Sequence, residues 1–173
     1  MAQTVPDKKK VAVLGAGKMG GILLQALLRD GLLAAPHVSA TVAHPERARV
    51  LKEKLKIRAG TDNLEAVRGA DVIFLCVKPQ VVSDVVREIS AHVSKNQLLI
   101  SLAASVPTEM IERGLGMEMP VVRAMPNTPC VLGAGMTALC KGRFAQKQHL
   151  EVAAGFFDAV DGATSRSGHR VFE

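Results

Sequence analysis

Hydrophobic positions along the chain alternate between short uninterrupted runs and longer segments with helical spacing. A short apolar run is typical of a strand buried on both faces of a parallel sheet, and helical spacing indicates a helix that covers such a sheet. The alternation predicts an α/β, doubly wound and mostly parallel sheet with helices on both faces. The runs predict strands at residues 10–14, 37–42, near Ile57, 71–77, 97–103, 121–124 and 136–141. The spacing predicts helices at 18–29, 45–55, after Thr61 or Asp62, at 81–89, 108–113 and 146–159.

The composition narrows the classes of protein further. The 173 residues suit one domain, and 48% hydrophobic residues exclude intrinsic disorder. No apolar run approaches a membrane span, and the N-terminus does not read as a secretory signal. Three cysteines without paired spacing (Cys76, Cys130 and Cys140) and five scattered histidines indicate neither disulfides nor a metal site. We therefore expect a cytoplasmic protein, with no membrane partner and no metal.

A glycine motif follows the first predicted strand and opens the first helix. It comprises Gly15, Ala16, Gly17, Lys18, Met19 and Gly20, in the pattern G-x-G-x-x-G. In this position, the first glycine allows a tight turn and the second lets the backbone approach a pyrophosphate. The third lets helix and strand pack closely, and the helix N-terminus offers N–H groups to the anion. The motif predicts a dinucleotide site in a Rossmann domain.

The end of the second strand bears on which dinucleotide is bound. An NAD site places a carboxylate there to bind the ribose 2′-hydroxyl, but residues 41–45 contain none. Six basic residues lie between Arg47 and Arg58, and the net charge is +6. His44 and Arg47 would interact favourably with a 2′-phosphate. This favours NADP(H) as the cofactor, with NAD(H) as the alternative. The basic residues beyond Arg49 fit better as a solvated helix face. Nucleic acid is not expected, because the chain has no Trp or Tyr on which bases could stack.

Three further segments follow strands and should line the same crevice, since ligands of open α/β sheets lie at the carboxyl ends of the strands. Lys78 can place an ammonium near a phosphate or carboxylate, or can be a surface lysine. Asn127 lies between two prolines and can offer its amide to a ligand, or can serve as a turn residue. These segments contribute the cofactor candidates Val77, Lys78, Pro79, Ala103, Ala104, Met125, Pro126, Asn127 and Thr128.

The motifs GAGKMG, VKPQ and VVRAMPNTPCVLGAGMTAL together resemble pyrroline-5-carboxylate reductase over residues 11–159. The resemblance implies hydride transfer from NAD(P)H to the C=N carbon of the cyclic imine 1-pyrroline-5-carboxylate, giving L-proline. The family holds the cofactor through the glycine loop, the VKP segment and the MPNTP segment. A protonated imine is already electrophilic, so the protein mainly aligns the reactants, and we assign no catalytic residue.

Two departures from the family stand out. Ser105 follows the fifth strand where the family commonly has glycine. The family also continues into a helical domain that forms an intertwined homodimer and binds substrate. We expect a dinucleotide-binding domain at 1–160, an irregular tail at 161–173, no such helical domain, and hence a truncated reductase. The oligomeric state stays open, and the isolated chain is expected to bind NADP(H) yet reduce the imine poorly.

Two alternatives remain. One is a free-standing NADP(H)-sensing domain without turnover. The other is a different reductase of the same fold, such as the coenzyme F420-dependent NADP reductases or the β-hydroxyacid dehydrogenases, although the MPNTP segment favours pyrroline-5-carboxylate reductase.

Overall fold

The computed structural model describes residues 9–126, 137–160 and 170–172. In this part of the chain, eight strands form one sheet in the order β3-β2-β1-β4-β5-β6-β7-β8. The strands from β1 to β6 are parallel, β7 runs antiparallel to β6, and β8 runs parallel to β7. The predicted fold class is confirmed. The strands are β1 (Val11–Leu14), β2 (Val38–Thr41), β3 (Arg58–Gly60), β4 (Val72–Leu75), β5 (Leu98–Ser101), β6 (Val121–Pro126), β7 (Thr137–Lys141) and β8 (Arg170–Phe172).

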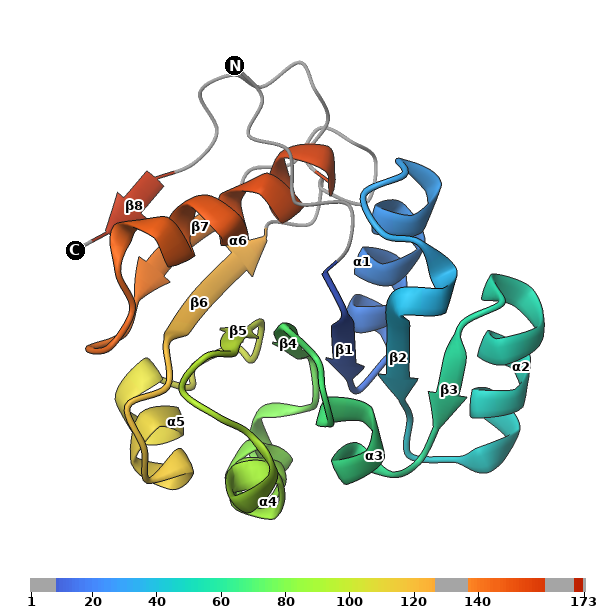
Figure 1. Cartoon of the computed structure of the whole chain (residues 1–173), viewed down its shortest axis with the longest axis horizontal. Helices are drawn as coiled ribbons and strands as arrows, with labels where there is room; N and C mark the ends of the chain where they lie inside the picture. The colour runs from blue at the N-terminus through green and yellow to red at the C-terminus, as the bar shows by residue number, and fades with distance from the viewer. Residues whose placement is uncertain (1–8, 127–136, 161–169, 173) are drawn as a thin grey trace.

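Helices cover both faces of the sheet (Figure 1). One hydrophobic cluster joins the sheet to α1, α2 and α6, and a second joins the opposite face to α3, α4 and α5. This arrangement follows from right-handed βαβ crossovers, which place helices on alternate faces where the strand order reverses. The helices are α1 (Lys18–Arg29), α2 (Pro45–Leu55), α3 (Asn63–Val67), α4 (Val82–Ile89), α5 (Thr108–Leu115) and α6 (Lys147–Val160), with short 3₁₀ turns at Ala35–His37, Pro79–Val81 and Ser90–His92.

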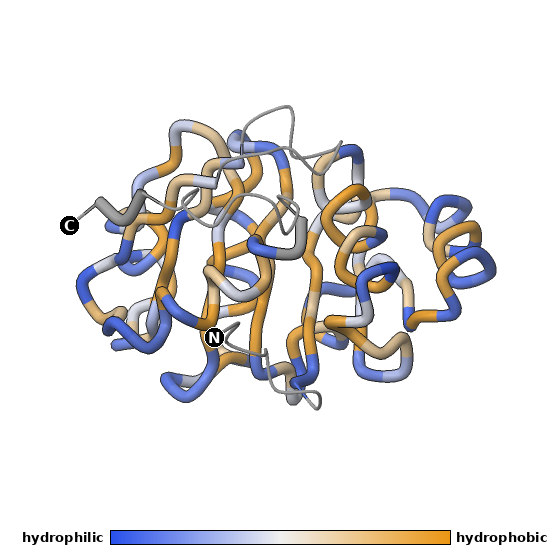
Figure 2. The backbone as a smooth tube through the Cα atoms, turned by 90° about the horizontal axis from the view of Figure 1, so that it is seen from above, coloured by the Kyte–Doolittle hydropathy of each residue, from blue (hydrophilic) through white to orange (hydrophobic). Residues whose placement is uncertain are grey.

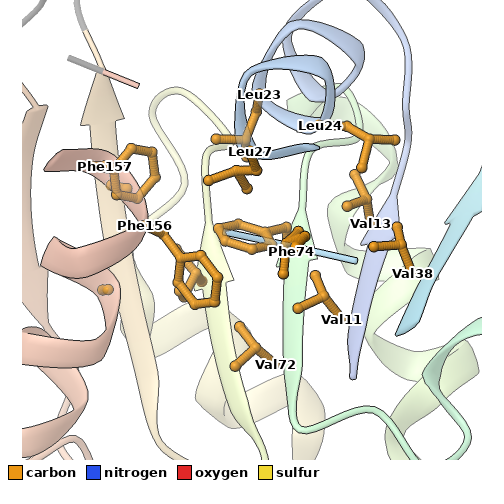
Figure 3. Packing of buried hydrophobic residues seen from close by; sticks show 14 of the residues in the cluster. Val11, Val13, Leu23, Leu24, Leu27, Val38, Val72, Phe74, Phe156 and Phe157 are labelled. Atoms are coloured by element: carbon orange, nitrogen blue, oxygen red, sulfur yellow. The ribbon is translucent and has the colours of Figure 1, made fainter. Parts of the chain in front are cut away.

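Hydrophobic residues are concentrated along the central strands, as Figure 2 shows. Every residue of β1, β4 and β5 is buried, as expected for strands covered on both faces. Phe74 of β4 meets Phe156 and Phe157 of α6 edge to face, with ring centroids 5.2 and 6.4 Å apart (Figure 3). These contacts anchor α6 on the same face as α1.

Local sequence signals explain several of the element boundaries. The helix α2 begins at Pro45, as predicted, because proline suits the first helical turn. Of the two candidate caps for α3, Asp62 is the cap: its carboxylate accepts the N–H groups of Leu64 and Glu65 at 2.8 and 3.0 Å. The strands β4 and β5 are shorter than their apolar runs, because those runs continue into half-buried and buried residues beyond the strand ends.

The prediction of an irregular tail is wrong for Arg170–Phe172, which form β8 and pair with β7. The pairing has a simple physical reason. Without β8, the outer backbone groups of β7 would lack partners in the sheet, and a short strand supplies them. A strand of three residues is too short for its hydrophobic pattern to be recognised in the sequence.

Candidate functional site: the glycine loop and the carboxyl edge of the sheet

The strands β1, β4, β5 and β6 are parallel and therefore end at one edge of the sheet. Backbone hydrogen bonds tie their exits together: the N–H of Cys76 donates to the carbonyl of Leu14 at 2.8 Å, and the N–H of Leu102 to the carbonyl of Leu75 at 2.9 Å. The predicted glycine loop and the segment after β4 thus lie side by side. This edge is the place where open α/β sheets bind ligands.

The three glycines of the loop differ in the space around them. Gly15 has φ +86°, and a Cβ there would lie 2.8 Å from the side chain of Val77. A Cβ at Gly20 would lie 2.5 Å from the carbonyl oxygen of Gly15 and 2.9 Å from the Cβ of Cys76. At Gly17, by contrast, an added Cβ meets nothing within 4 Å. Gly15 and Gly20 are thus required by the protein itself, whereas Gly17 faces open space in which a ligand could approach the backbone.

The helix α1 begins just after the loop and points its N-terminus at the same space. Gly17 is its N-cap, and no side chain caps the helix. The first-turn N–H groups of a helix lack intrahelical acceptors, so they favour an anion in front of them. With twelve residues, α1 is long enough to have a substantial dipole. Loop and helix together form a cradle suited to a pyrophosphate.

His44 and Arg47 lie where the sequence analysis expects them, next to the end of β2. His44 is the N-cap of α2 and Arg47 lies in its first turn, and both side chains are exposed. Within the described part of the chain, no carboxylate lies within ion-pair distance of Arg47, whereas the nearby Arg49 faces Glu53 at 4.0 Å. The first turn of α2 therefore presents an exposed cation and the positive end of the helix dipole at the edge of the crevice.

The remaining candidates follow β4, β5 and β6. Lys78 and Pro79 are exposed after β4, Ala103 is buried and Ala104 exposed after β5, and Met125 is 53% exposed at the end of β6 beside Pro126. The structure brings Val77 into contact distance of the loop, as the Gly15 geometry shows. Asn127 and Thr128 lie outside the described residues.

Ser105, the first departure from the family pattern, has φ +60°. This left-handed conformation costs a non-glycine residue about 1–2 kcal/mol, whereas glycine adopts it freely. Glycine would therefore relieve the backbone at position 105.

Cys76 is packed under the loop. The residue as a whole keeps partial exposure, but burial of its thiol raises the pKa to about 12. At neutral pH the sulfur is therefore a protonated thiol and not a nucleophile. Among the described residues, no group of three His, Cys, Asp or Glu side chains could hold a metal ion.

Sequence reasoning missed one part of the site, the polar support behind the loop. The N–H of Gly15 donates to the carbonyl and the hydroxyl of Thr41 at 3.1 and 3.3 Å, and the Thr41 hydroxyl donates to Asn63 Oδ1 at 2.8 Å. Thr41 is 3% exposed. Thr41 is one of two polar residues in β2 and its partner Asn63 lies 22 residues away in sequence, so no local signal marked it.

A doubly wound sheet with a glycine loop against a helix N-terminus defines the class: a dinucleotide-binding domain of the NAD(P)-dependent oxidoreductases. More particularly, the chain belongs to the family described as NADP oxidoreductase, coenzyme F420-dependent, whose model matches residues 10–105.

Relatives of known function confirm the resemblance to pyrroline-5-carboxylate reductase. The chain is 33% identical over 154 residues to that enzyme from Methanosarcina acetivorans, covering 89% of the chain and 57% of the relative. Identity to the Mycobacterium leprae enzyme is 38% over 158 residues, covering 88% and 53%. Identity to the Escherichia coli enzyme is 33% over 132 residues, which cover 76% of this chain and 49% of that enzyme. The chain thus spans about half the length of the curated relatives it matches.

Solved structures agree. A pyrroline-5-carboxylate reductase from Coxiella burnetii superposes with a TM-score of 0.86 at 29% identity, covering 96% of this chain and 59% of that one. A Plasmodium falciparum pyrroline carboxylate reductase with NADP bound has a TM-score of 0.81 at 22% identity, covering 96% and 58%. The second similarity concerns the fold alone.

Proposed function

We propose that the chain binds NADP(H) at the glycine loop and takes part in the reduction of 1-pyrroline-5-carboxylate to L-proline. The observation that carries the cofactor part is the open approach to Gly17 in front of the uncapped N-terminus of α1. The substrate part rests on relatives that are pyrroline-5-carboxylate reductases and match 76–89% of this chain.

The residues present fit a dinucleotide. The backbone of residues 15–20 and the first turn of α1 would hold the pyrophosphate. Val77, Lys78 and Pro79 would border the part of the dinucleotide that follows the pyrophosphate. The segments after β5 and β6 would border its nicotinamide end. The proposed cofactor-binding set is Gly15, Ala16, Gly17, Lys18, Met19, Gly20, His44, Arg47, Val77, Lys78, Pro79, Ala103, Ala104, Met125, Pro126, Asn127 and Thr128.

For the adenosine end we favour the 2′-phosphate over the free hydroxyl. The end of β2 carries no carboxylate to accept a hydrogen bond from a ribose hydroxyl. Arg47 has no carboxylate partner in the described part of the chain, and α2 directs its N-terminus to the same place. Both features favour an added negative charge. NAD(H) is the alternative cofactor.

The proposed reaction needs the protein mainly to align the reactants and to exclude water. When bound, NADPH supplies a hydride whose electron pair forms the new C–H bond at the C=N carbon of the protonated imine, leaving NADP⁺ and proline. The protein's part is to hold the reactants in line and to keep water from the nicotinamide end. The exposed Ala104 has no polar side-chain atoms, which suits the apolar face of a nicotinamide ring.

The cofactor assignment is tested by titrating NADPH and NADH and following the fluorescence of the reduced nicotinamide. We expect tighter binding of NADPH than of NADH. Arg47→Ala should weaken NADPH binding about tenfold, as expected for a lost charge-assisted contact of roughly 1.4 kcal/mol, and leave NADH unchanged. Arg49→Ala removes the same charge two residues away and is the matched control. Tighter binding of NADH, or equal effects of both variants, would contradict the assignment.

The substrate assignment is tested by NADPH oxidation in the presence of the imine. A second candidate, hydride exchange between NADP(H) and coenzyme F420, is favoured by the description of the matching family. The two are separated by offering each substrate in turn. NADPH binding without turnover of either would instead favour the sensing domain.

Other predictions of the sequence analysis stay proposals. They are the domain division at residue 160, a small-molecule substrate, a homo-oligomer for the full-length family, a cytoplasmic location, and no nucleic-acid partner. No helix in the described ranges is long and apolar enough to cross a membrane.

A further inference from the structure

A chain of side-chain hydrogen bonds runs from the glycine loop to the helix α4. The N–H of Gly15 is shared between the carbonyl of Thr41 at 3.1 Å and its hydroxyl oxygen at 3.3 Å, and that hydroxyl donates to Asn63 Oδ1 at 2.8 Å. Asn63 Nδ2 then donates to Glu88 Oε2 at 2.9 Å. Four elements far apart in sequence are joined in this way: the loop, the end of β2, the first residue of α3, and α4.

Each link fixes the direction of the next. A carboxylate accepts hydrogen bonds but does not donate them, so Glu88 must face the NH₂ group of Asn63. The carboxamide oxygen of Asn63 is then turned toward Thr41, whose proton it accepts. The hydroxyl oxygen of Thr41 remains free to accept the N–H of Gly15. If the carboxamide rotated by 180°, it would place a donor against Thr41 and leave the buried hydroxyl proton without its acceptor.

One end of this chain of hydrogen bonds lies in a helix packed on the sheet, and the other end lies in a loop. α4 is anchored on the sheet by four buried residues (Val82, Val85, Val86 and Ile89) and packs against α3, as Figure 1 shows. Gly15 is a left-handed glycine in a loop whose position decides where the pyrophosphate can lie. The hydrogen bonds therefore couple the loop to a firmly packed helix on the opposite face of the sheet from α1.

We propose that Glu88 is a positioning residue for the glycine loop: through Asn63 and Thr41 it holds Gly15 in the conformation that binds the pyrophosphate. The consequence for cofactor affinity rests on the proposed function. Glu88 does this from outside the proposed cofactor-binding set. Because the pyrophosphate is common to both dinucleotides, Glu88 affects NADPH and NADH equally, unlike Arg47.

The test compares three variants of α4 in the whole chain. Glu88→Leu removes the acceptor, Glu88→Gln keeps a carbonyl oxygen that can accept from Asn63, and Asp84→Leu removes a carboxylate from the same helix. Asp84 is the matched control because its partner is the exposed Arg87, at 3.6 Å. The dissociation constants of NADPH and NADH are measured by nicotinamide fluorescence. The exchange rate of the Gly15 amide is measured by NMR in the cofactor-free protein.

We expect Glu88→Leu to raise both dissociation constants about threefold to tenfold, the effect of one hydrogen bond. The Gly15 amide should exchange faster in that variant. Glu88→Gln should restore both readouts, and Asp84→Leu should change neither. Thr41→Val, which removes the hydroxyl at nearly constant volume, should reproduce the loss without touching α4.

Two results would overturn the proposal. One is a Glu88→Leu protein with unchanged dissociation constants and unchanged Gly15 exchange. The other is a loss confined to NADPH, which would place the effect at the 2′-phosphate and not at the loop. If the wild-type chain binds neither nucleotide, the proposed function fails instead. The Gly15 exchange rates then decide on their own whether Glu88 holds the loop.

Discussion

The close approach of α1 to the sheet yields a prediction that two adjacent glycines test. A Cβ at Gly20 would lie 2.5 Å from the carbonyl oxygen of Gly15 and 2.9 Å from the Cβ of Cys76. At Gly21 the nearest atom, the carbonyl oxygen of Ala16, would lie 3.5 Å away, which is an ordinary contact. Both glycines are buried in the first half of α1. Gly20→Ala and Gly21→Ala therefore differ in crowding and in little else.

The magnitude follows from two opposing effects. Replacing a helical glycine by alanine stabilises a helix by up to about 1 kcal/mol, and this gain applies to both positions. Overpacking costs about 1–3 kcal/mol, and Gly20 lies near the upper value because a backbone carbonyl cannot rotate away as a side chain can. The free energy of unfolding should fall by about 2 kcal/mol in Gly20→Ala and rise by up to about 1 kcal/mol in Gly21→Ala.

Urea unfolding followed by far-ultraviolet circular dichroism is the suitable assay, because the chain has no Trp or Tyr to report by fluorescence. The expected difference of about 3 kcal/mol between the two variants corresponds to about 6–12 °C in melting temperature for a chain of this size. Unchanged slopes of the urea transitions would show that the unfolded states are comparable. Equal stability of the two variants would refute the close packing of α1 against the strand ends.

Four further predictions concern the loop, the core and the strand ends. Gly17→Ala should lower NADPH affinity at least about tenfold in a fluorescence titration, because its methyl group would occupy the approach to the phosphate, and should cost less stability than Gly20→Ala. Phe156→Ala should lower the free energy of unfolding by about 3–5 kcal/mol in urea, since the ring is fully buried against Phe74; a loss below about 1 kcal/mol would contradict the packing. Iodoacetamide should modify Cys76 at pH 8 only in the unfolded chain, as peptide mass spectrometry would show. Because burial raises the pKa of this thiol from 9.0 to about 12, its contribution to stability is complete below pH 9 and is lost as the pH rises toward 12. Ser105→Gly should raise the free energy of unfolding by about 1 kcal/mol by relieving the left-handed conformation, and no gain in urea would contradict that strain.

Much of the fold was predictable from local patterns. The apolar runs locate six parallel strands and β7, and proline, aspartate and glycine signals mark where α2, α3 and α1 begin. Strand ends were less predictable: the apolar run over residues 71–77 contains only four strand residues, because Cys76 and Val77 are half-buried beside the glycine loop and lie beyond the end of β4. The antiparallel direction of β7 and the pairing of β8 depend on partners distant in the chain.

The candidate site also has a part that was predictable from local sequence and a part that was not. The glycine motif is local, since the turn, the anion cradle and the close packing are all properties of six consecutive residues, and the sequence by itself therefore predicted it. The support behind the motif is not local: Thr41, Asn63 and Glu88 are separated by 22 and 25 positions and meet only because β2, α3 and α4 converge at one edge of the sheet. Nothing in their own neighbourhoods in the sequence distinguishes them from an ordinary strand end, helix start and surface carboxylate.

The sequence alone determined the fold class, the first strand–loop–helix unit and the resemblance to pyrroline-5-carboxylate reductase. All three depend on short-range patterns of residue type. The tertiary structure decided which glycines tolerate a side chain, that Ser105 has a left-handed backbone conformation, and which buried hydroxyl accepts a hydrogen bond from the loop. Those properties depend on distances between atoms of different elements, which a hydrophobic period does not encode.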